Sequence, residues 1–192
     1  GWGFYVFRIG TAQNIIIEAP HPLADEHTPE VALDIYRALN AKALIIAGAH
    51  RDANRDGSAD SAHAPESIFQ TVHTTLFQNT QPSNNNAIFL QIHGFAARDH
   101  PEYPQIVIGH TWKDEPEKDL LLQKIAAAMK SNDIELGICN GKKYQDLCGR
   151  SNLQGSVMDD GIFIHMELNE SLRRDDSALV NSLKQAIRQY FP

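Results

Sequence analysis

Apolar runs alternate with amphipathic stretches along the whole chain. The short runs are rich in apolar and β-branched residues and have the length of strands. They predict strands at residues 3–8, 14–18, 43–47, 87–93, 105–109, 134–139 and 161–168. The longer stretches carry an apolar residue every three or four positions, which is the period of a helix. They predict helices at residues 28–40, 65–78, 115–131 and 176–190.

Two of the predicted helices have sequence signals in their first turn. Thr28 is a favoured N-cap residue, and Pro29 fits the first helical position. The apolar face that follows consists of Val31, Ala32, Ile35 and Leu39. The last helix begins in a similar way at Asp176 and Ser177. Its predicted buried side consists of Leu179, Leu183 and Ile187.

The order of these elements predicts the fold class. The strand at 43–47 is apolar throughout, which is typical of a sheet covered on both faces. Because strands and helices alternate, we expect a three-layer α/β/α sandwich with a mixed, largely parallel sheet. The length of 192 residues fits a single domain over residues 1–192. The polar run at 83–86 is interpreted as a loop rather than a linker between domains.

Composition and charge exclude some classes of partner. Hydrophobic residues make up 42% of the chain and charged residues 21%, as in an ordinary globular protein. The formal net charge of −7 argues against nucleic acid, because phosphate binding needs a basic surface. No run of about 18 apolar residues is present, so we expect no membrane span. The expected partner is a small molecule or a peptide, and the oligomeric state stays open.

The cysteines and the first residue give information on the cellular compartment of the protein. Cys139 and Cys148 are too few for a disulfide scaffold, but they allow either one bridge that closes a short loop or two free thiols. The sequence begins at Gly1, as a chain does after trimming or after removal of a signal peptide. Removal of a signal peptide would mean export, so a periplasmic or secreted location is favoured over the cytoplasm.

Polar motifs stand at the ends of several predicted strands. His21 and Asp25 follow the strand at 14–18, His93 ends the strand at 87–93, and Glu167 lies within the strand at 161–168. In open α/β sheets, ligand sites form at the carboxyl ends of strands. Histidines and carboxylates delivered in this way are typical of a zinc hydrolase, which needs metal ligands and a carboxylate that activates water.

Each metal-ligand candidate also has a structural interpretation. His21 lies between two prolines and can be an ordinary loop histidine. Glu26 and His27 compete with Asp25, so the identity of the acidic ligand stays open. His93 can be a buried structural histidine, but the glycine directly after it favours a site, because glycine lets a bound group approach the backbone.

Glu167 and the loop after the strand at 43–47 complete the candidate chemistry. A carboxylate rarely lies inside an apolar strand unless it has a hydrogen-bond or ion-pair partner or a functional role. Glu167 can serve as general base and then as general acid, and the alternative is a structural ion pair with an arginine. Arg51 and Asn54 offer N–H donors for a substrate carboxylate or a developing oxyanion, and the alternative is a solvated loop. His63 and His165 are candidates for supporting the metal ligands.

The order of these motifs resembles that of the N-formylglutamate amidohydrolase family, which is related to zinc carboxypeptidases and aspartoacylases. That family has a strand ending in Pro-His, then an Asp, then an Arg with an Asp-Leu-Asn-Arg motif. A strand ending in Asp-x-His and a late strand reading Gln-x-Glu-Leu/Ile-Asn follow. The corresponding segments of this sequence are Pro20-His21, Asp25, Arg51, Asp52-Ala53-Asn54-Arg55, Gln91-Ile92-His93 and His165-Met166-Glu167-Leu168-Asn169.

The resemblance implies a phosphorylase/hydrolase-like fold of the zinc-carboxypeptidase type, with one Zn²⁺ ion. It assigns His21, Asp25 and His93 as metal ligands. It gives Glu167 and Arg51 catalytic roles, and it makes Asn54 and Arg55 substrate contacts. The implied function is zinc-dependent hydrolysis of an amide or peptide bond in a small carboxylate-bearing substrate, such as an N-acyl amino acid or a short peptide.

Two other functions are alternatives to the hydrolase. One is a non-catalytic domain of the same fold that binds a ligand or a metal. Nothing needed for catalysis is missing from the motifs, which favours the enzyme. The other is a phosphate-recognising protein, which the sequence does not favour because it has no Gly-rich phosphate loop.

Overall fold

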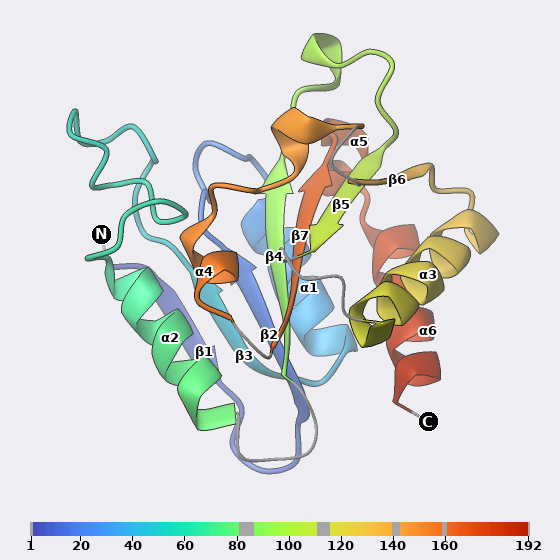
Figure 1. Ribbon diagram of the computed structural model, residues 1–192, viewed down its shortest axis with the longest axis horizontal. Coiled ribbons are helices and arrows are strands. Elements are labelled where there is room, and N and C mark those ends of the chain that lie inside the picture. Colours follow the sequence, from blue (N-terminus) through green and yellow to red (C-terminus); the bar gives the residue numbers. More distant parts are fainter. Residues whose placement is uncertain (1, 81–86, 111–115, 140–142, 159–160, 192) are drawn as a thin grey trace.

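The computed structural model describes residues 2–80, 87–110, 116–139, 143–158 and 161–191 (Figure 1). These residues form a seven-stranded sheet with helices on both faces. The polar run at 83–86 and residue 115, at the start of a predicted helix, lie outside the described residues. No helix in the described ranges is long and apolar enough to span a membrane.

Every predicted strand is present, with bounds that differ from the prediction by one or two residues. The strands are β1 (Phe4–Phe7), β2 (Gln13–Ala19), β3 (Ala41–Ile46), β4 (Ile88–Gly94), β5 (Ile106–His110), β6 (Leu136–Ile138) and β7 (Ile162–Leu168). Their order in the sheet is β1-β3-β2-β4-β7-β5-β6. β1 pairs with β3 and β5 pairs with β7 in antiparallel fashion, and the other neighbours are parallel. The prediction of a mixed, largely parallel sheet is therefore confirmed.

The predicted helices are also present. They are α1 (Thr28–Ala38), α2 (Ile68–Thr80), α3 (Pro116–Ser131) and α6 (Ser177–Tyr190). The sequence pattern missed α4 (Leu153–Ser156), α5 (Glu170–Arg174) and the 3₁₀ turns at Ala97–Asp99 and Gln145–Leu147. These helices are too short to show a helical period. Asn152 and Asn169 are the N-cap residues of α4 and α5. Their side chains accept hydrogen bonds from backbone amides in the first turn of each helix.

The start of α1 differs from the prediction. His27 is the N-cap, with a φ of 69°, and Thr28 is the first helical residue. The prediction of Thr28 as the N-cap is wrong, because its hydroxyl donates upstream to the backbone oxygen of Asp25 at 2.7 Å instead of accepting from a helix amide. This hydrogen bond ties the first turn of α1 to the loop that carries Asp25.

Alternating residues of β2 show the two faces of the sheet. Ile15 and Ile17 belong to the large core that α1, α3 and α6 cover. Ile16 packs on the other face with Phe77 of α2. Figure 1 shows α2 and α4 on one side of the sheet and α1, α3 and α6 on the other. The three-layer α/β/α sandwich is thus confirmed.

The face covered by α2 becomes polar toward the carboxyl ends of the parallel strands. Glu18 of β2 pairs in register with Gln91 of β4, and His93 of β4 pairs with Glu167 of β7. Since side chains alternate along a strand, Glu18 points to the same face as Ile16. The candidate residues on β4 and β7 therefore meet at one edge of the sheet, on the side of α2 and α4.

A disulfide joins Cys139 and Cys148, whose Cα atoms lie 5.6 Å apart. The bridge closes a short loop with a sequence separation of 9. Replacing both cysteines with serine should lower the free energy of unfolding by about 2–3 kcal/mol, because the unfolded chain gains loop entropy. Urea unfolding of both forms measures this difference. Identical transitions for the wild type and the double variant would contradict it.

Candidate metal centre

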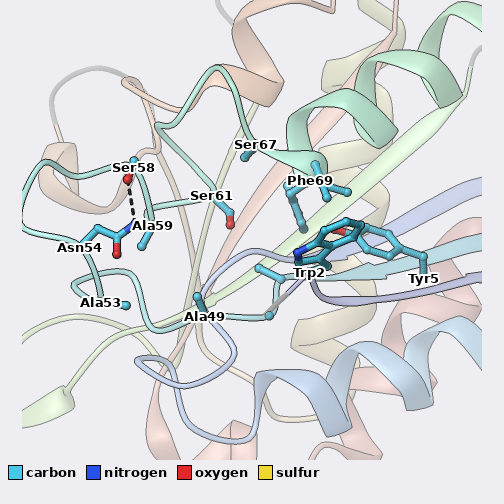
Figure 2. Close-up of a pocket in the computed structure, with 13 residues that line it drawn as sticks. Trp2, Tyr5, Ala49, Ala53, Asn54, Ser58, Ala59, Ser61, Ser67 and Phe69 are labelled. Atoms are coloured by element: carbon cyan, nitrogen blue, oxygen red, sulfur yellow. Dashed lines mark hydrogen bonds between the residues drawn. The ribbon is translucent and has the colours of Figure 1, made fainter.

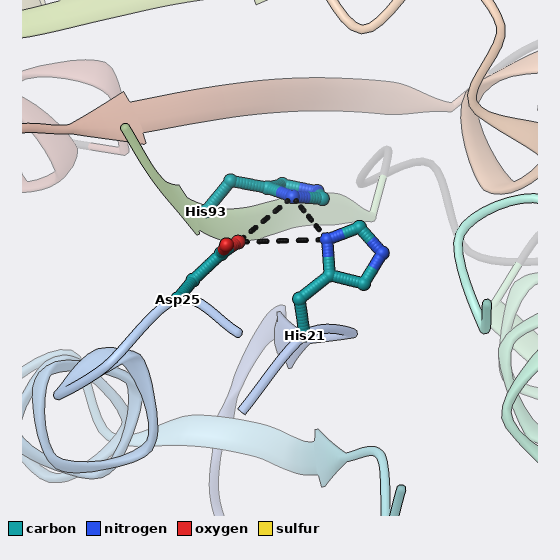
Figure 3. A group of neighbouring side chains, drawn as sticks. All are labelled: His21, Asp25 and His93. Carbon is teal, nitrogen blue, oxygen red and sulfur yellow. Dashed lines mark hydrogen bonds and ion pairs between the residues drawn. The ribbon is translucent and has the colours of Figure 1, made fainter. Parts of the chain in front are cut away.

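His21, Asp25 and His93 converge at the carboxyl edge of the sheet (Figure 3). The Nδ1 atoms of the two histidines lie 3.2 Å apart, and Oδ2 of Asp25 lies 3.5 Å from each of them. All three side chains are buried. The turn after β2 places the first two, because the backbone amide of Asp25 donates to the carbonyl of His21 at 2.8 Å.

The spacing of these three atoms fits a tetrahedral metal ion. Ligand atoms that lie about 2.0–2.1 Å from a tetrahedral zinc are about 3.3–3.4 Å from one another. The observed distances of 3.2 and 3.5 Å bracket that value. Two imidazoles and one carboxylate are also a donor set that zinc accepts.

The outer nitrogens of both rings have acceptor partners. Nε2 of His21 lies 2.8 Å from Oδ1 of Asp60, and Nε2 of His93 lies 2.8 Å from Oε1 of Gln91. A carboxylate and an amide carbonyl only accept, so each Nε2 carries a proton. In the neutral rings each Nδ1 atom is then unprotonated and carries a lone pair, and the two lone pairs face each other. Two buried lone pairs at hydrogen-bond distance fit a cation between them, and partners of this kind orient metal-bound histidines.

The charges around the centre favour a cation. Burial opposes a charge on His21, but the carboxylates of Asp25 and Asp60, which accept hydrogen bonds from the charged ring, outweigh burial and raise its pKa. Burial would likewise raise the pKa of Asp25, but its contacts with the rings of His21 and His93 hold that pKa well below its usual range. Burial and the charge of His165 lower the pKa of His93 to about 4, so this ring is neutral at neutral pH. A neutral imidazole is the form that binds a metal.

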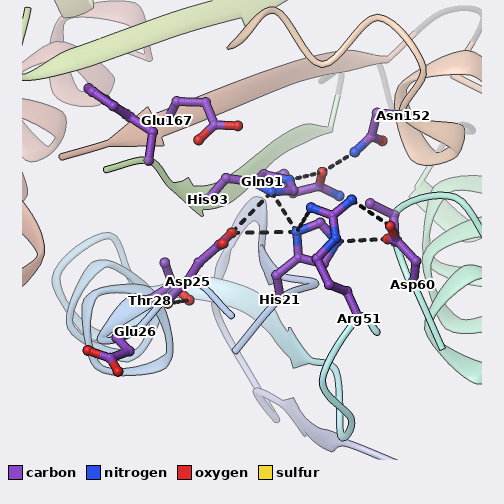
Figure 4. Close-up of polar contacts among 12 residues, drawn as sticks. His21, Asp25, Glu26, Thr28, Arg51, Asp60, Gln91, His93, Asn152 and Glu167 are labelled. Atoms are coloured by element: carbon purple, nitrogen blue, oxygen red, sulfur yellow. Dashed lines mark hydrogen bonds and ion pairs between the residues drawn. The ribbon is translucent and has the colours of Figure 1, made fainter. Parts of the chain in front are cut away.

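Arg51 and Asp60 flank the centre (Figure 4). Nη2 of Arg51 donates to Oδ2 of Asp60 at 2.7 Å, and its Nη1 lies 3.5 Å from Nδ1 of His21. His63 lies behind Asp60, with Nδ1 at 3.0 Å from the same oxygen. Burial disfavours the charge on Asp60, but the hydrogen bond and charge of His21, the hydrogen bond from His63 and the charge of Arg51 lower its pKa to about 2. The side chain of Arg51 is 37% exposed, which leaves the guanidinium open to a substrate.

Glu167 lies beside His93 on the neighbouring strand. Its Oε1 accepts a hydrogen bond from Nε2 of His165 at 3.1 Å. The ring of His165 packs against the ring of His93, with 4.4 Å between the centroids. Among the described residues no arginine pairs with Glu167, so the structure does not contain the ion pair considered as its alternative role.

Asn54 and Arg55 are not brought to this cluster. The amide of Asn54 donates to the hydroxyl of Ser58 at 2.8 Å, within an exposed loop. Asn54 lines a separate cavity of about 310 Å³, whose other wall is formed by the aromatic side chains of Trp2, Tyr5 and Phe69 (Figure 2). Arg55 is exposed on the same loop.

The surroundings of the cluster bear on two features that the sequence left open, the acidic member and Gly94. Glu26 is exposed, and Figure 4 shows its carboxylate pointing away from the histidines, so the acidic member of the cluster is Asp25. Gly94 was expected to let a bound group approach the backbone. The group that approaches is the guanidinium of Arg173, which a side chain at this position would meet. Arg173 donates to the backbone oxygens of Glu26, Phe95 and Leu168 and thereby joins the loop after β2 to the carboxyl ends of β4 and β7.

Sequence reasoning missed Asp60, Gln91 and Glu18 as parts of the site. Asp60 lies in an irregular loop, and no local pattern distinguishes it from other loop carboxylates. Glu18 and Gln91 did carry a signal, because each is a polar residue inside an apolar strand. The same argument that singled out Glu167 applies to them.

Comparison with known proteins shows which solved structures have a similar fold. No family model and no curated protein matches the chain. A bacteriophage poly-γ-glutamate hydrolase has a TM-score of 0.64 at 13% identity, with 97% of this chain and 89% of that chain covered. For N-formylglutamate amidohydrolase from Ralstonia eutropha the TM-score is 0.59 at 10% identity, with 97% of each chain covered.

A metallo-carboxypeptidase from Burkholderia cenocepacia has a TM-score of 0.54 at 11% identity, with 99% of this chain and 65% of that chain covered. At such identities the likeness concerns the fold. The expected zinc-carboxypeptidase-like fold is confirmed, and the amidohydrolase that the motifs resemble is among the structural neighbours of this protein.

Proposed function

We propose that this protein is a zinc-dependent hydrolase that cleaves an amide or peptide bond in a small substrate with a free carboxylate. The observation that carries this proposal is the pair of buried Nδ1 atoms, 3.2 Å apart, beside the carboxylate of Asp25. The fold supports it, since an amidohydrolase, a poly-γ-glutamate hydrolase and a metallo-carboxypeptidase share it.

His21, Asp25 and His93 would hold the metal. A zinc ion bound there supplies Lewis acidity, which lowers the pKa of a coordinated water and polarises a substrate carbonyl. Glu167 takes the proton from the attacking water and later delivers it to the leaving amine. The hydrogen bond from His165 fixes the position of this carboxylate. The buried setting of both histidines limits the access of bulk water to the reacting groups.

Arg51 binds the free carboxylate of the substrate. Its guanidinium is anchored on one side by Asp60 and reaches the edge of the metal centre on the other. An anchored guanidinium can form paired hydrogen bonds with a carboxylate. We assign Asn54 to a contact with the more distant part of the substrate, because it lines the neighbouring cavity. Arg55 is assigned to the same part of the substrate, because it is exposed next to Asn54 on the loop that also carries Arg51 and Asp60.

Masking the free carboxylate of a substrate as an amide should raise KM by about tenfold or more, since a hydrogen bond to a charged group is worth about 1.5–3 kcal/mol. Arg51→Gln should remove most of the difference between the free and masked forms. Arg98→Gln is the matched control, because Arg98 is an exposed arginine outside the site. Equal KM values for both substrate forms in the wild type would contradict this role of Arg51.

The proposed function is tested with metal-stripped and zinc-reloaded protein. Both forms are assayed against a panel of N-acyl amino acids and γ-glutamyl peptides, with release of the amine as the readout. We expect turnover only after zinc is restored. Turnover of equal rate in the stripped protein would contradict zinc dependence. Zinc and ligand binding without any turnover would support a non-catalytic binding domain instead.

A further inference from the structure

Behind His93, on the side of α2 and α4, the structure holds a layer of buried polar side chains. Its fully buried members are Glu18, His73, Gln91 and Gln154. Burying polar groups is costly unless their hydrogen bonds are made. Gln91 stands at the centre of this layer and contacts His93 directly (Figure 4). The partners of its amide decide which end faces the histidine.

Two acceptors fix the NH₂ end of Gln91. Its Nε2 donates to Oε2 of Glu18 at 2.9 Å and to Oε1 of Gln154 at 3.1 Å. The carboxylate of Glu18 has no hydrogen to give, and its other oxygen lies 2.7 Å from Nδ1 of His73. Gln154 cannot turn around either, because its own NH₂ group donates to the backbone oxygen of Ser61 at 3.0 Å.

The carbonyl end of Gln91 therefore points to His93. Its Oε1 lies 2.8 Å from Nε2 of His93 and also accepts from the side-chain amide of Asn152. If the amide were reversed, its NH₂ group would face the NH₂ group of Asn152, and its oxygen would face Glu18 and Gln154. Such an arrangement loses several buried hydrogen bonds at once, each worth about 0.5–1.5 kcal/mol and more where a charge is involved.

We propose that Gln91 is a positioning residue that sets the tautomer of His93. Because the carbonyl of Gln91 accepts from Nε2, the neutral ring keeps its proton there and presents the lone pair of Nδ1 to His21 and Asp25. The buried carboxylate of Glu18 supports this role by holding the amide of Gln91 in one orientation. The inference rests on the proposed metal site, in which Nδ1 of His93 is a ligand atom.

Loss of the acceptor has a specific consequence. Without it, a proton on Nε2 would be a buried donor with no partner, which costs about 1–3 kcal/mol. A proton on Nδ1 would instead find acceptors, since Oδ2 of Asp25 lies 3.5 Å away and Nδ1 of His21 lies 3.2 Å away. The proton would then occupy the atom that has to bind the metal.

Gln91→Met removes the acceptor and keeps the length of the side chain. The ring nitrogens of His93 are followed by ¹⁵N NMR in metal-free protein at neutral pH, and zinc affinity is measured by competition with a chelator. We expect the wild type to carry its proton on Nε2 and the variant to carry it on Nδ1. Zinc affinity should fall by about 10–100-fold, the usual effect of removing a partner of a metal ligand.

The second variant exchanges the carboxylate of Glu18 and the amide of Gln91. In the double variant Glu18→Gln, Gln91→Glu a carboxylate accepts directly from His93, and the total buried charge is unchanged. It should keep the proton on Nε2 and bind zinc far more tightly than Gln91→Met. Phe89→Leu is the matched control on the same face of β4, where Phe89 packs against His73. It should lower the Tm without changing the tautomer or the zinc affinity.

A folded Gln91→Met protein with the proton on Nε2 and wild-type zinc affinity would overturn the inference. A folded double variant with the proton on Nδ1 would also overturn it. If Gln91→Met does not fold, the tautomer of His93 in the double variant tests the role of Gln91. The tautomer is measured without metal, so the two proposals fail separately. An inverted tautomer in Gln91→Met, combined with a wild type that binds no zinc, would refute the metal site and leave the role of Gln91 in orienting His93 intact.

Discussion

Glu167→Gln should lower kcat by about 10²–10⁴-fold, the range typical of general acid–base catalysis. The amide keeps the size of the side chain, and its carbonyl can still accept from Nε2 of His165. It cannot take a proton from water at neutral pH. Because Glu167 is not among the three side chains proposed to hold the metal, bound zinc and the Tm should stay close to the wild-type values.

This prediction requires kcat, zinc content and Tm to be measured on the same sample. Glu170→Gln is the matched control, because the carboxylate of Glu170 accepts from the backbone amide of Ala97 at 3.0 Å and lies on α5, after the strand that carries Glu167. It should lower the Tm and leave kcat unchanged. A Glu167→Gln protein that is less stable yet fully active would assign this carboxylate a structural role.

His93→Ala should lower zinc affinity by more than the roughly 10–100-fold that the loss of a partner behind a ligand costs. It removes one of three protein ligands and leaves His21 and Asp25 alone. In the wild type, zinc at 100 times its Kd should stabilise the fold by about 2.7 kcal/mol and raise the Tm. In the variant the same zinc concentration should produce almost no shift.

Metal analysis and thermal melts with and without zinc measure this second effect. His100→Ala is the control, since His100 lies outside the cluster and pairs with Asp146. It should keep full zinc occupancy and the zinc-dependent shift in Tm. Full occupancy and an unchanged shift in His93→Ala would exclude His93 as a ligand.

The fold and the convergence of His21 and His93 followed from local sequence patterns. Apolar runs such as Ile15–Ile17 define buried strands, and parallel strands bring their carboxyl ends to one edge of the sheet. His21 and His93 were predictable because each stands at such an end. The resemblance then favoured Asp25 over Glu26, and the burial of Asp25 agrees with that choice.

The partners behind the ligands were only partly predictable. Glu18 and Gln91 stand out as polar residues in apolar strands, but the contacts of Asp60 and Gln154 join distant segments. Asp60 meets His21 across 39 positions, and Gln154 meets Gln91 across 63. Short helices such as α4 contain too few residues to show the helical repeat of apolar positions from which a helix is predicted. Loop conformation decided the place of Asn54, which lines a neighbouring cavity although its motif suggested a substrate contact at the centre.

In the proposed function His21, Asp25 and His93 hold one metal ion. The most direct test is a crystal structure of protein purified without added metal, with anomalous diffraction recorded on both sides of the zinc absorption edge. We expect a single anomalous peak between the two Nδ1 atoms and the carboxylate of Asp25, strong above the edge and weak below it. A zinc peak bound elsewhere, or protein that takes up no zinc at this site even when the ion is supplied, would contradict it.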